Sequence, residues 1–217
     1  RDVAPSRGLG DVYKRQIMNH TLDYYNKNAQ QFSKETISVD FTKTQDRFLN
    51  YLTDKGYILD FGCGSGRDTK YFLDKGFQVK AVDGSKELCR LAAEYTGIKV
   101  GQMLFEDLDE KEIYDGIWAC SSILHLPKTE LTGVIGKMCA ALKASGIIYT
   151  SFKYGEYEGE RNGRYFTDFT IENFRKFIQN IDSVKIEEYW ITGDVRQGRG
   201  EAVSYTHLRA HETELHL

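Results

Sequence analysis

The sequence predicts an α/β fold, a doubly wound and mostly parallel sheet with helices on both faces. Short apolar segments with strand character alternate with amphipathic segments at helical spacing, a pattern typical of right-handed βαβ units. A second observation is the glycine-rich turn Gly62-Cys63-Gly64-Ser65-Gly66, which directly follows an apolar run. Glycines between a strand and a helix let a ligand approach the backbone and form a nucleotide-type pocket at the carboxyl end of a sheet.

The predicted elements follow one another in chain order. Helices are expected at residues 18–33, 41–53, 67–74, 86–95, 130–143 and 170–181. Strands are expected at residues 57–61, 77–82, 98–101, 116–120, 147–152 and 184–191. Residues 153–165 break this alternation, being rich in Gly, Glu, Arg and Tyr without a period. We expect them to form a functional loop or lid at the carboxyl edge of the sheet.

Both ends of the chain resemble translated adapter sequence from DNA sequencing libraries. Residues 6–16 resemble the adapter, and residues 203–213 resemble its reverse complement in a single reading frame. We therefore expect residues 1–16 and 202–217 to be non-native and residues 17–201 to be the domain, since scars of this kind are excluded from fold reasoning. The alternative is a pair of genuine tails. Three histidines lie in the C-terminal segment and receive no functional weight: His207, His211 and His216.

Composition excludes several classes of function. The net charge is −3 and the isoelectric point is near 6.0, so there is no basic footprint for nucleic acid. No apolar run is long enough for a membrane span and no signal peptide is visible, which favours a cytoplasmic protein without membrane contact. The cysteines form no C-x-x-C pair and are expected to be reduced, and no metal site is expected: Cys63, Cys89, Cys120 and Cys139. The sequence does not predict an oligomeric state.

The spacing of the glycines indicates which ligand the turn binds. A dinucleotide fingerprint counted from Gly62 needs a third glycine at position 67, where this chain has Arg67. The pattern present, Asp-x-Gly-x-Gly-x-Gly from Asp60 to Gly66, resembles motif I of the class I S-adenosylmethionine (SAM) methyltransferases. The resemblance covers about residues 24–201. A glycine-rich loop without a chemical role is the alternative.

The resemblance implies SAM as the cofactor and a Rossmann-like methyltransferase sheet that ends in an antiparallel strand. That strand would begin just after Glu201, where the adapter-like sequence takes over. We therefore expect the final antiparallel strand to be missing, or replaced by residues 202–205.

The resemblance also assigns cofactor contacts. Asp83, about twenty residues after the turn and followed by Gly84, would accept hydrogen bonds from the ribose hydroxyls, as an acid there does in dinucleotide folds. Asp60 would orient the turn or reach the methionyl ammonium through water, and Asp68 would either assist it or cap the next helix. The complete set of cofactor-binding candidates is Asp60, Gly62, Cys63, Gly64, Gly66, Asp83, Gly84, Leu104, Phe105, Glu106 and Cys120.

Within that set, the adenine would lie against Leu104 and Phe105. Many relatives carry an acid at the position that aligns with Leu104, and Glu106 is expected to substitute for it. The backbone carbonyl of Cys120 would face the methionyl end. The segment 119–127 resembles the post-strand motif of small-molecule methyltransferases. It does not resemble the Asp/Asn-Pro-Pro-Tyr signature of enzymes that methylate adenine or amides, because serines stand at positions 121 and 122.

The candidate catalytic residues are His125, Tyr154 and Arg164. His125 follows the fourth strand and is expected to act as a base or substrate contact, with a structural histidine as an equal alternative. The segments 152–166 and 193–201 together resemble small bacterial methyltransferases akin to the tellurite-resistance type. Cations gather there and favour an anionic small-molecule acceptor, unless they pair with the loop's own glutamates: Lys153, Arg161, Arg164, Arg196 and Arg199.

The mechanism implied is an in-line attack of an acceptor atom on the sulfonium methyl group. The protein would act by holding the reactants in line and excluding water, with a base needed only for a protonated oxygen or nitrogen acceptor. Two alternatives are kept: a SAM-binding regulatory protein without turnover, and an NAD-dependent oxidoreductase, which Arg67 disfavours.

Overall fold

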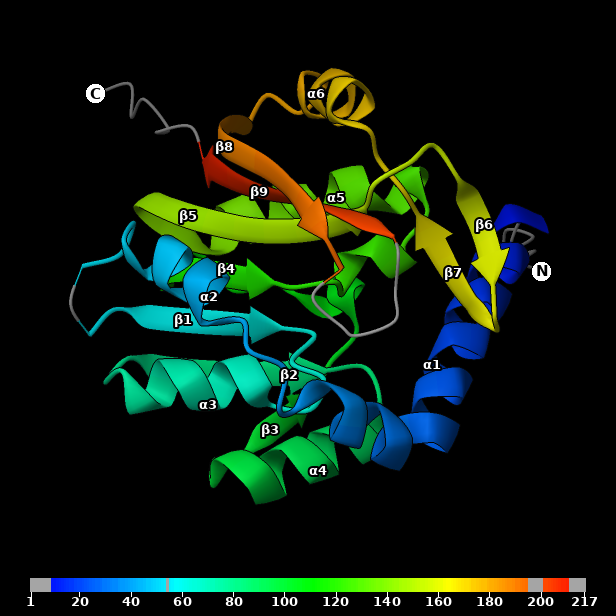
Figure 1. Ribbon diagram of the computed structural model, residues 1–217. Coiled ribbons are helices and arrows are strands. Elements are labelled where there is room, and N and C mark those ends of the chain that lie inside the picture. The colour runs from blue at the N-terminus through cyan, green and yellow to red at the C-terminus, as the bar shows by residue number, and fades with distance from the viewer. Residues whose placement is uncertain (1–8, 54, 195–200, 211–217) are drawn as a thin grey trace, which may run out of the picture.

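The computed structural model describes residues 9–53, 55–194 and 201–210, whose main sheet has the strand order β3-β2-β1-β4-β5-β9-β8 (Figure 1). Strands β1 to β5 pair in parallel, whereas β9 pairs antiparallel with both β5 and β8. The predicted fold class is confirmed. The strands are β1 (Tyr57–Phe61), β2 (Gln78–Asp83), β3 (Val100–Gln102), β4 (Tyr114–Ala119), β5 (Leu142–Lys153), β8 (Val184–Gly193) and β9 (Ala202–Ala210).

The order of the strands determines where a ligand can bind. The chain runs outward from β1 to β2 and β3, then returns to place β4 on the other side of β1. Ile58 of β1 lies between Val79 of β2 and Gly116 of β4 in the ladder. The turns after β1 and β4 therefore leave the sheet in opposite directions and open a crevice at its carboxyl edge, as doubly wound sheets do.

The helices follow the predicted order with shifted boundaries. They are α1 (Leu9–Thr36), α2 (Thr42–Leu49), α3 (Arg67–Asp74), α4 (Lys86–Thr96), α5 (Lys128–Ala141) and α6 (Ile171–Ile178), with short 3₁₀ turns η1 (Phe105–Asp107) and η2 (Ile123–His125). Helix α4 shows how the sequence fixes its ends. The Ser85 hydroxyl accepts a hydrogen bond from the Leu88 N–H, and Gly97 ends the helix at a φ of 77°. None of the described helices is both long and apolar enough to cross a membrane.

Apolar side chains bury both faces of the sheet. On one face, Leu131 of α5 and Phe174 of α6 belong to the same buried cluster as Ile148 of β5. On the other face, Phe48 of α2 packs with Trp118 of β4, their ring centroids 5.1 Å apart. Because helices cover both sides, the open edge of the sheet at its carboxyl end is the natural position for a site.

The prediction of a loop over residues 153–165 is wrong in its secondary structure. Strand β5 continues to Lys153, and β6 (Glu158–Arg161) pairs with β7 (Arg164–Thr167) in a separate two-stranded hairpin. Asn162 and Gly163 form its turn, with φ values of 51° and 74°. An Asn-Gly turn with both φ positive matches the twist of a hairpin. The hairpin lies beside α1 at one side of the molecule (Figure 1).

The segments expected to be non-native take part in regular structure. Residues 9–16 extend α1, and residues 202–210 form β9 in the place predicted for the final antiparallel strand. That strand is thus present, through the second of the predicted alternatives. It buries His207 opposite Tyr149 of β5, and neither His207 Nε2 nor the buried Thr150 Oγ1 of β5 has a hydrogen-bond partner within the described part of the chain. The boundaries at residues 1–16, 17–201 and 202–217 stay a prediction.

Candidate active site

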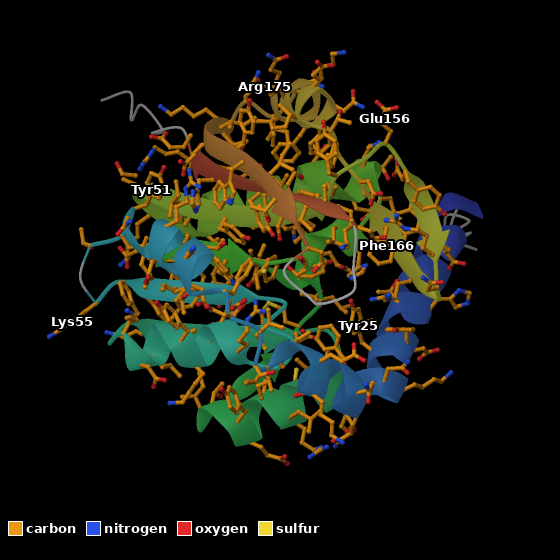
Figure 2. All side chains as sticks on the ribbon, in the orientation of Figure 1. Tyr25, Tyr51, Lys55, Glu156, Phe166 and Arg175 are labelled. Carbon is orange, nitrogen blue, oxygen red and sulfur yellow. The ribbon has the colours of Figure 1, made fainter. Side chains whose placement is uncertain are left out.

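A cavity of about 240 Å³ opens at the carboxyl ends of the parallel strands, between the glycine turn, α1 and the hairpin. Figure 2 shows Tyr25 and Phe166 on the side where α1 and the hairpin lie, opposite Tyr51 and Lys55. The predicted site residues that line the cavity are Gly62, Cys63, Gly64, Asp83, Gly84, Leu104, Phe105, Cys120, His125 and Arg164. The structure thus brings most of the predicted set together.

The glycine turn requires glycine at its first position. Gly62 has a φ of 88°, and a Cβ there would lie 2.4 Å from the Cβ of Ser122. Ser122 cannot retreat easily, because its hydroxyl donates to the Phe61 carbonyl at 2.6 Å. The turn is also held from below, where the amides of Gly62 and Cys63 both donate to the Val82 carbonyl at 2.9 Å. The backbone therefore presents a fixed surface to the cavity.

Asp83 connects the ends of β1 and β2. One of its carboxylate oxygens accepts the Gly64 N–H at 2.9 Å, and the other accepts the Ser85 N–H at 2.8 Å. Burial raises the pKa of Asp83, whereas these amide hydrogen bonds lower it. Each oxygen keeps a lone pair that can accept from a ligand hydroxyl. Gly84 follows at a close approach of α1, since a Cβ there would lie 2.7 Å from Leu22 Cδ2.

Asp60 lies beneath the turn and is not among the cavity-lining residues of the described chain. It is 1% exposed and accepts a hydrogen bond from the Thr69 hydroxyl. Burial raises the pKa of Asp60 to about 8, and the negative charge of Asp68 acts in the same direction. Burial thus favours the protonated form of this acid, which supports the turn from behind.

The other predicted residues outside the cavity lining are Gly66, Glu106 and Tyr154. Gly66 begins α3 and faces α4, where a Cβ would lie 2.8 Å from Thr96 Cγ2. Glu106 is exposed in η1, with its carbonyl accepting the Lys137 ammonium. The Tyr154 residue is 43% exposed on the outer surface.

Arg67 and Asp68 line the cavity but were missed as a pair by the sequence analysis. The Arg67 guanidinium donates to both Asp68 oxygens, at 2.8 and 2.9 Å. Asp68 also accepts from Gln45 Nε2 at 2.7 Å and Trp118 Nε1 at 2.8 Å, so it fixes the arginine rather than capping α3. The signal was present in the sequence as an arginine directly after the third glycine, where it served only to exclude a dinucleotide.

His125 lies at the other side of the cavity, in a hydrogen-bonded chain. Its Nδ1 is 2.6 Å from the Tyr165 carbonyl oxygen, and its Nε2 is 2.8 Å from the Tyr25 hydroxyl. Burial lowers the pKa of His125 to about 3; the hydrogen bond to Tyr165 opposes this, while the positive charges of Arg164 and Arg161 reinforce it. The imidazole is therefore neutral at physiological pH. Tyr25 was also missed from the sequence, because it lies on a helix a hundred residues away.

The cations predicted for the acceptor site differ in their partners. Lys153 Nζ lies 2.6 Å from Asp194 and 2.7 Å from Glu201. The Arg161 guanidinium pairs with Asp168 at 2.6 Å. Both cations are thus neutralised by acids from neighbouring segments rather than by the loop glutamates. Arg196 and Arg199 lie outside the described residues.

Arg164 has a different environment. Within the described residues it forms no ion pair, and its buried Nε has no hydrogen-bond partner. Its guanidinium carbon lies 4.4 Å from the ring centroid of Tyr24 and 5.1 Å from that of Phe166. Aromatic faces attract a cation without removing its ability to bind an anion. Arg164 is therefore a guanidinium available to a ligand in the cavity.

The cavity consists of two parts that are named separately below. The cofactor half comprises the glycine turn 62–66 with the residues beneath and around it: Asp60, Arg67, Asp83, Gly84, Leu104 and Phe105. The acceptor half comprises Tyr25, His125, Lys153, Arg161, Arg164 and Phe166. The described residues contain no group of three or more His, Cys, Asp or Glu side chains arranged to hold a metal ion.

Comparison with known proteins identifies the family. The family description "Methyltransferase domain" matches residues 58–146. An uncharacterised methyltransferase of Geobacillus thermodenitrificans is 30% identical over 159 residues, which cover 69% of this chain and 70% of that protein. This chain belongs to the methyltransferases. The enzyme class and SAM as the methyl donor, both expected from the glycine turn, are confirmed.

Solved structures share the fold of this methyltransferase at low sequence identity. The 1,6-didemethyltoxoflavin N1-methyltransferase of Burkholderia thailandensis, solved with its acceptor and S-adenosylhomocysteine, is similar with a TM-score of 0.74 and 19% identity, covering 97% of this chain and 94% of that one. A protein of Rhodobacter sphaeroides titled as a putative zinc-dependent alcohol dehydrogenase has a TM-score of 0.71 and 13% identity, covering 89% and 98%. At these identities the likeness shows the fold alone.

Proposed function

We propose that this methyltransferase transfers the methyl group of SAM to a small-molecule acceptor that carries an anionic group, by in-line displacement. The observation that carries the proposal is Arg164, a half-buried arginine of the acceptor half whose buried Nε has no hydrogen-bond partner and which forms no ion pair in the described chain. Removing part of an unpaired cation from water is costly unless a ligand or aromatic faces compensate it. A carboxylate or similar oxyanion on the acceptor would form charge-assisted hydrogen bonds with it.

The residues of the cofactor half fit SAM. Asp83 has lone pairs for the ribose hydroxyls, and the close approaches at Gly62 and Gly84 leave no room for a side chain. Leu104 and Phe105 line the cavity where an adenine ring would lie, and Arg67, held by Asp68, would donate hydrogen bonds to the methionyl carboxylate. When bound, SAM supplies a sulfonium methyl group already activated for attack. The chain's own residues then orient the reactants and exclude water.

A small-molecule acceptor suits the acceptor half, a partly open cavity that is walled by α1 and the hairpin. Thr21 of α1 accepts the Tyr165 N–H at 3.0 Å, and Thr167 donates to the Leu126 carbonyl at 2.7 Å. The hairpin is thus attached to the body of the protein on both of its sides. The net charge of −3 offers no basic surface for a nucleic acid. The Burkholderia thailandensis methyltransferase that shares the fold was solved with bound 1,6-didemethyltoxoflavin.

Calorimetric titration with SAM and with NAD tests the donor directly. We expect heat and a raised melting temperature with SAM and neither with NAD, because the turn lacks the third glycine of the dinucleotide fingerprint. The alternative of an oxidoreductase would give the reverse. A regulatory protein would bind SAM but release no S-adenosylhomocysteine when incubated with fractionated cell metabolites.

The anionic acceptor is tested with Arg164→Gln. We expect the affinity of an anionic probe, para-hydroxybenzoate titrated in the presence of S-adenosylhomocysteine, to fall roughly tenfold, since a charge-assisted hydrogen bond is lost. SAM affinity should stay within about twofold, because Arg164 lies outside the cofactor half. Arg175→Gln is the matched control. Its guanidinium also lies on an aromatic ring, 4.8 Å from Tyr189, but away from the cavity. Equal affinity in Arg164→Gln and the control would contradict the proposal.

A further inference from the structure

We propose that Tyr25 takes the proton of the acceptor atom during methyl transfer and passes its own to His125, so that the methylated atom is an oxygen or nitrogen that carries a hydrogen. This inference rests on the proposed function and adds to it the chemical class of the acceptor atom. It also gives His125 a different role from the one expected from the sequence. His125 does not meet the acceptor through a ring nitrogen, because both nitrogens already have partners.

The direction of each hydrogen bond follows from what the groups can donate. The Tyr165 carbonyl oxygen can only accept, so the hydrogen on the neutral imidazole resides on Nδ1. Nε2 then carries a lone pair and can only accept, so the Tyr25 hydroxyl donates to it at 2.8 Å. The phenol oxygen, having given its hydrogen to the histidine, presents lone pairs as an acceptor. A ligand group that hydrogen-bonds to this oxygen must therefore be a donor such as O–H or N–H.

The carbonyl that fixes the histidine is itself held firmly. The N–H of Tyr165 donates to the Thr21 hydroxyl at 3.0 Å, and its carbonyl accepts from His125. Helix α1 thus supplies both Thr21, which anchors the hairpin, and Tyr25, which lies one turn further along the helix. The Tyr25 ring is held edge-on against Phe32 at 5.2 Å and against the imidazole at 5.4 Å. One series of hydrogen bonds therefore joins a proton acceptor, His125, to the Tyr165 carbonyl that orients it and to Tyr25, which lines the cavity.

The proposed step balances in atoms and charge. A lone pair of the acceptor oxygen or nitrogen forms the bond to the methyl carbon, and the electrons of the broken carbon–sulfur bond stay on sulfur. The acceptor's hydrogen moves to the Tyr25 oxygen while the Tyr25 hydrogen moves to Nε2 of His125. The imidazole becomes imidazolium, with Nδ1–H still donating to Tyr165. One positive charge disappears at sulfur as another appears at His125, so the net charge of the cavity does not change.

The charges that face His125 connect this step to the anionic acceptor. From the hairpin, Arg164 and Arg161 both disfavour protonation of the imidazole, and Arg161 is already paired with Asp168. From α1 the facing group is the Tyr25 phenol. An anion bound at Arg164 would offset the arginine charge that lowers the pKa of His125 more strongly than that of Arg161 does. A bound anionic acceptor would thereby make His125 a better proton acceptor than it is in the free enzyme.

The first test compares two probes that differ only in whether the attacking atom carries a proton at neutral pH. The hydroxyl of para-hydroxybenzoate must lose a proton, whereas the thiol of para-mercaptobenzoate is already a thiolate and reacts without a base. For Tyr25→Phe, we expect kcat with the hydroxyl probe to fall roughly a hundredfold or more, with a small change in KM. With the thiol probe we expect kcat to change less than about threefold, since no proton must be removed.

Two further variants separate a relay from a structural contact. His125→Gln offers an amide oxygen that can hold the Tyr25 hydroxyl but cannot take a proton, so it should lose activity with the hydroxyl probe as Tyr25→Phe does. Tyr71→Phe is the control. It removes a tyrosine hydroxyl that hydrogen-bonds Asp46 at 2.5 Å between α3 and α2, away from the cavity, and should keep wild-type kcat.

The second test needs no turnover. Nitrogen-15 NMR of the complex with S-adenosylhomocysteine, assigned by comparison with His125→Gln, should show His125 with hydrogen on Nδ1 and neutral down to about pH 4. Hydrogen on Nε2, or titration near the ordinary value for histidine, would overturn the relay. So would an unchanged kcat of Tyr25→Phe with the hydroxyl probe, or an equal loss with both probes. If the wild type methylates neither probe, the proposed acceptor class is wrong, and the NMR result alone decides the hydrogen-bonded chain.

Discussion

The two halves of the cavity are assembled from very different distances along the chain. In the cofactor half, Asp83 accepts from an amide 19 residues away, at Gly64, within a single βαβ unit. In the acceptor half, Tyr25 and His125 are 100 residues apart, and Thr21 and Tyr165 are 144 residues apart. A local unit forms its geometry wherever its sequence pattern occurs. The acceptor half exists only when a helix, a hairpin and a strand end have all packed together.

The halves also bury titratable groups of opposite kinds. In the cofactor half, burial raises the pKa of Asp60 to about 8 from 3.8, so between these values the folded protein holds a proton that the unfolded chain releases. Stability from this group falls as the pH rises through that range. In the acceptor half, burial lowers the pKa of His125 to about 3 from 6.5. There the unfolded chain binds the extra proton, so stability falls as the pH falls from about 6.5 towards 3.

The largest expected effect breaks the cofactor half alone. Gly62→Ala forces a side chain into a φ of 88° and within 2.4 Å of Ser122 Cβ. Strain and overpacking of this kind cost about 3 kcal/mol together, so SAM affinity measured by calorimetry should fall at least about a hundredfold. The tautomer of His125 should persist in the variant's NMR spectrum, because the acceptor half does not use the turn. Gly136→Ala, in α5 with nothing within 4 Å of the added Cβ, is the control and should bind SAM as the wild type does.

The next effect is a loss of folding stability at acidic pH that originates in the acceptor half. Between pH 7 and pH 5 the unfolded chain protonates the residue at position 125, while the folded protein leaves His125 neutral, so this histidine removes about 2 kcal/mol of stability. The free energy of unfolding, measured with urea at both pH values, should fall by about 2 kcal/mol less in His125→Gln than in the wild type. His207, whose pKa burial lowers to about 4, adds to the loss in both proteins. His20→Gln, at an exposed position, is the control. Parallel losses in His125→Gln and the wild type would show that the imidazole is not buried as described.

The smallest of these effects tests how far SAM binding in the cofactor half depends on the carboxylate of Asp83. Asp83→Ala removes the acceptor for the ribose hydroxyls and the support of the Gly64 amide, so SAM binding should weaken roughly tenfold or more. Asp115→Ala is a matched control at the opposite end of the sheet. It also loses a backbone hydrogen bond, from Tyr57 at 2.7 Å, and an ion pair with Lys143. SAM affinity should not change in the control, and equal weakening in both variants would refute the ribose assignment.

The difference between the halves explains what the sequence could predict. The strand, acid, glycines and helix of the cofactor half lie within one short segment, so spacing alone placed Gly62, Gly64 and Asp83 in one pocket. The partners of His125 could not be read in the same way, because nothing in its own segment indicates Tyr25 or the Tyr165 carbonyl. The sequence also grouped the cations of the acceptor half by type. Only packing distinguishes Lys153, paired with Asp194 and Glu201, from Arg164.

The hairpin was missed for a different reason. Its strands are only four residues each, and β6 reads Glu-Gly-Glu-Arg, in which Gly and Glu disfavour strands, so the Tyr, Phe and Thr of β7 gave no periodic signal on their own. The Asn162-Gly163 turn was the available sign, and it indicates a hairpin regardless of the flanking composition. The final strand, β9, differs from the hairpin because its residues do have strand propensity. Residues 202–210 carry β-branched and aromatic side chains that fit the position between β5 and β8, whatever their origin.

That position gives the sheet a particular order of assembly during protein synthesis. Strand β8 joins the sheet only through β9, although β8 leaves the ribosome first. A nascent chain that has reached residue 193 therefore holds β5 and β8 with facing, unpaired edges, which are open to aggregation and to proteases. Two residues of β9, Val203 and Tyr205, also line the cavity. The part of the cavity wall that these two residues form would thus be acquired only when translation has delivered β9, after the cofactor half has already been synthesised.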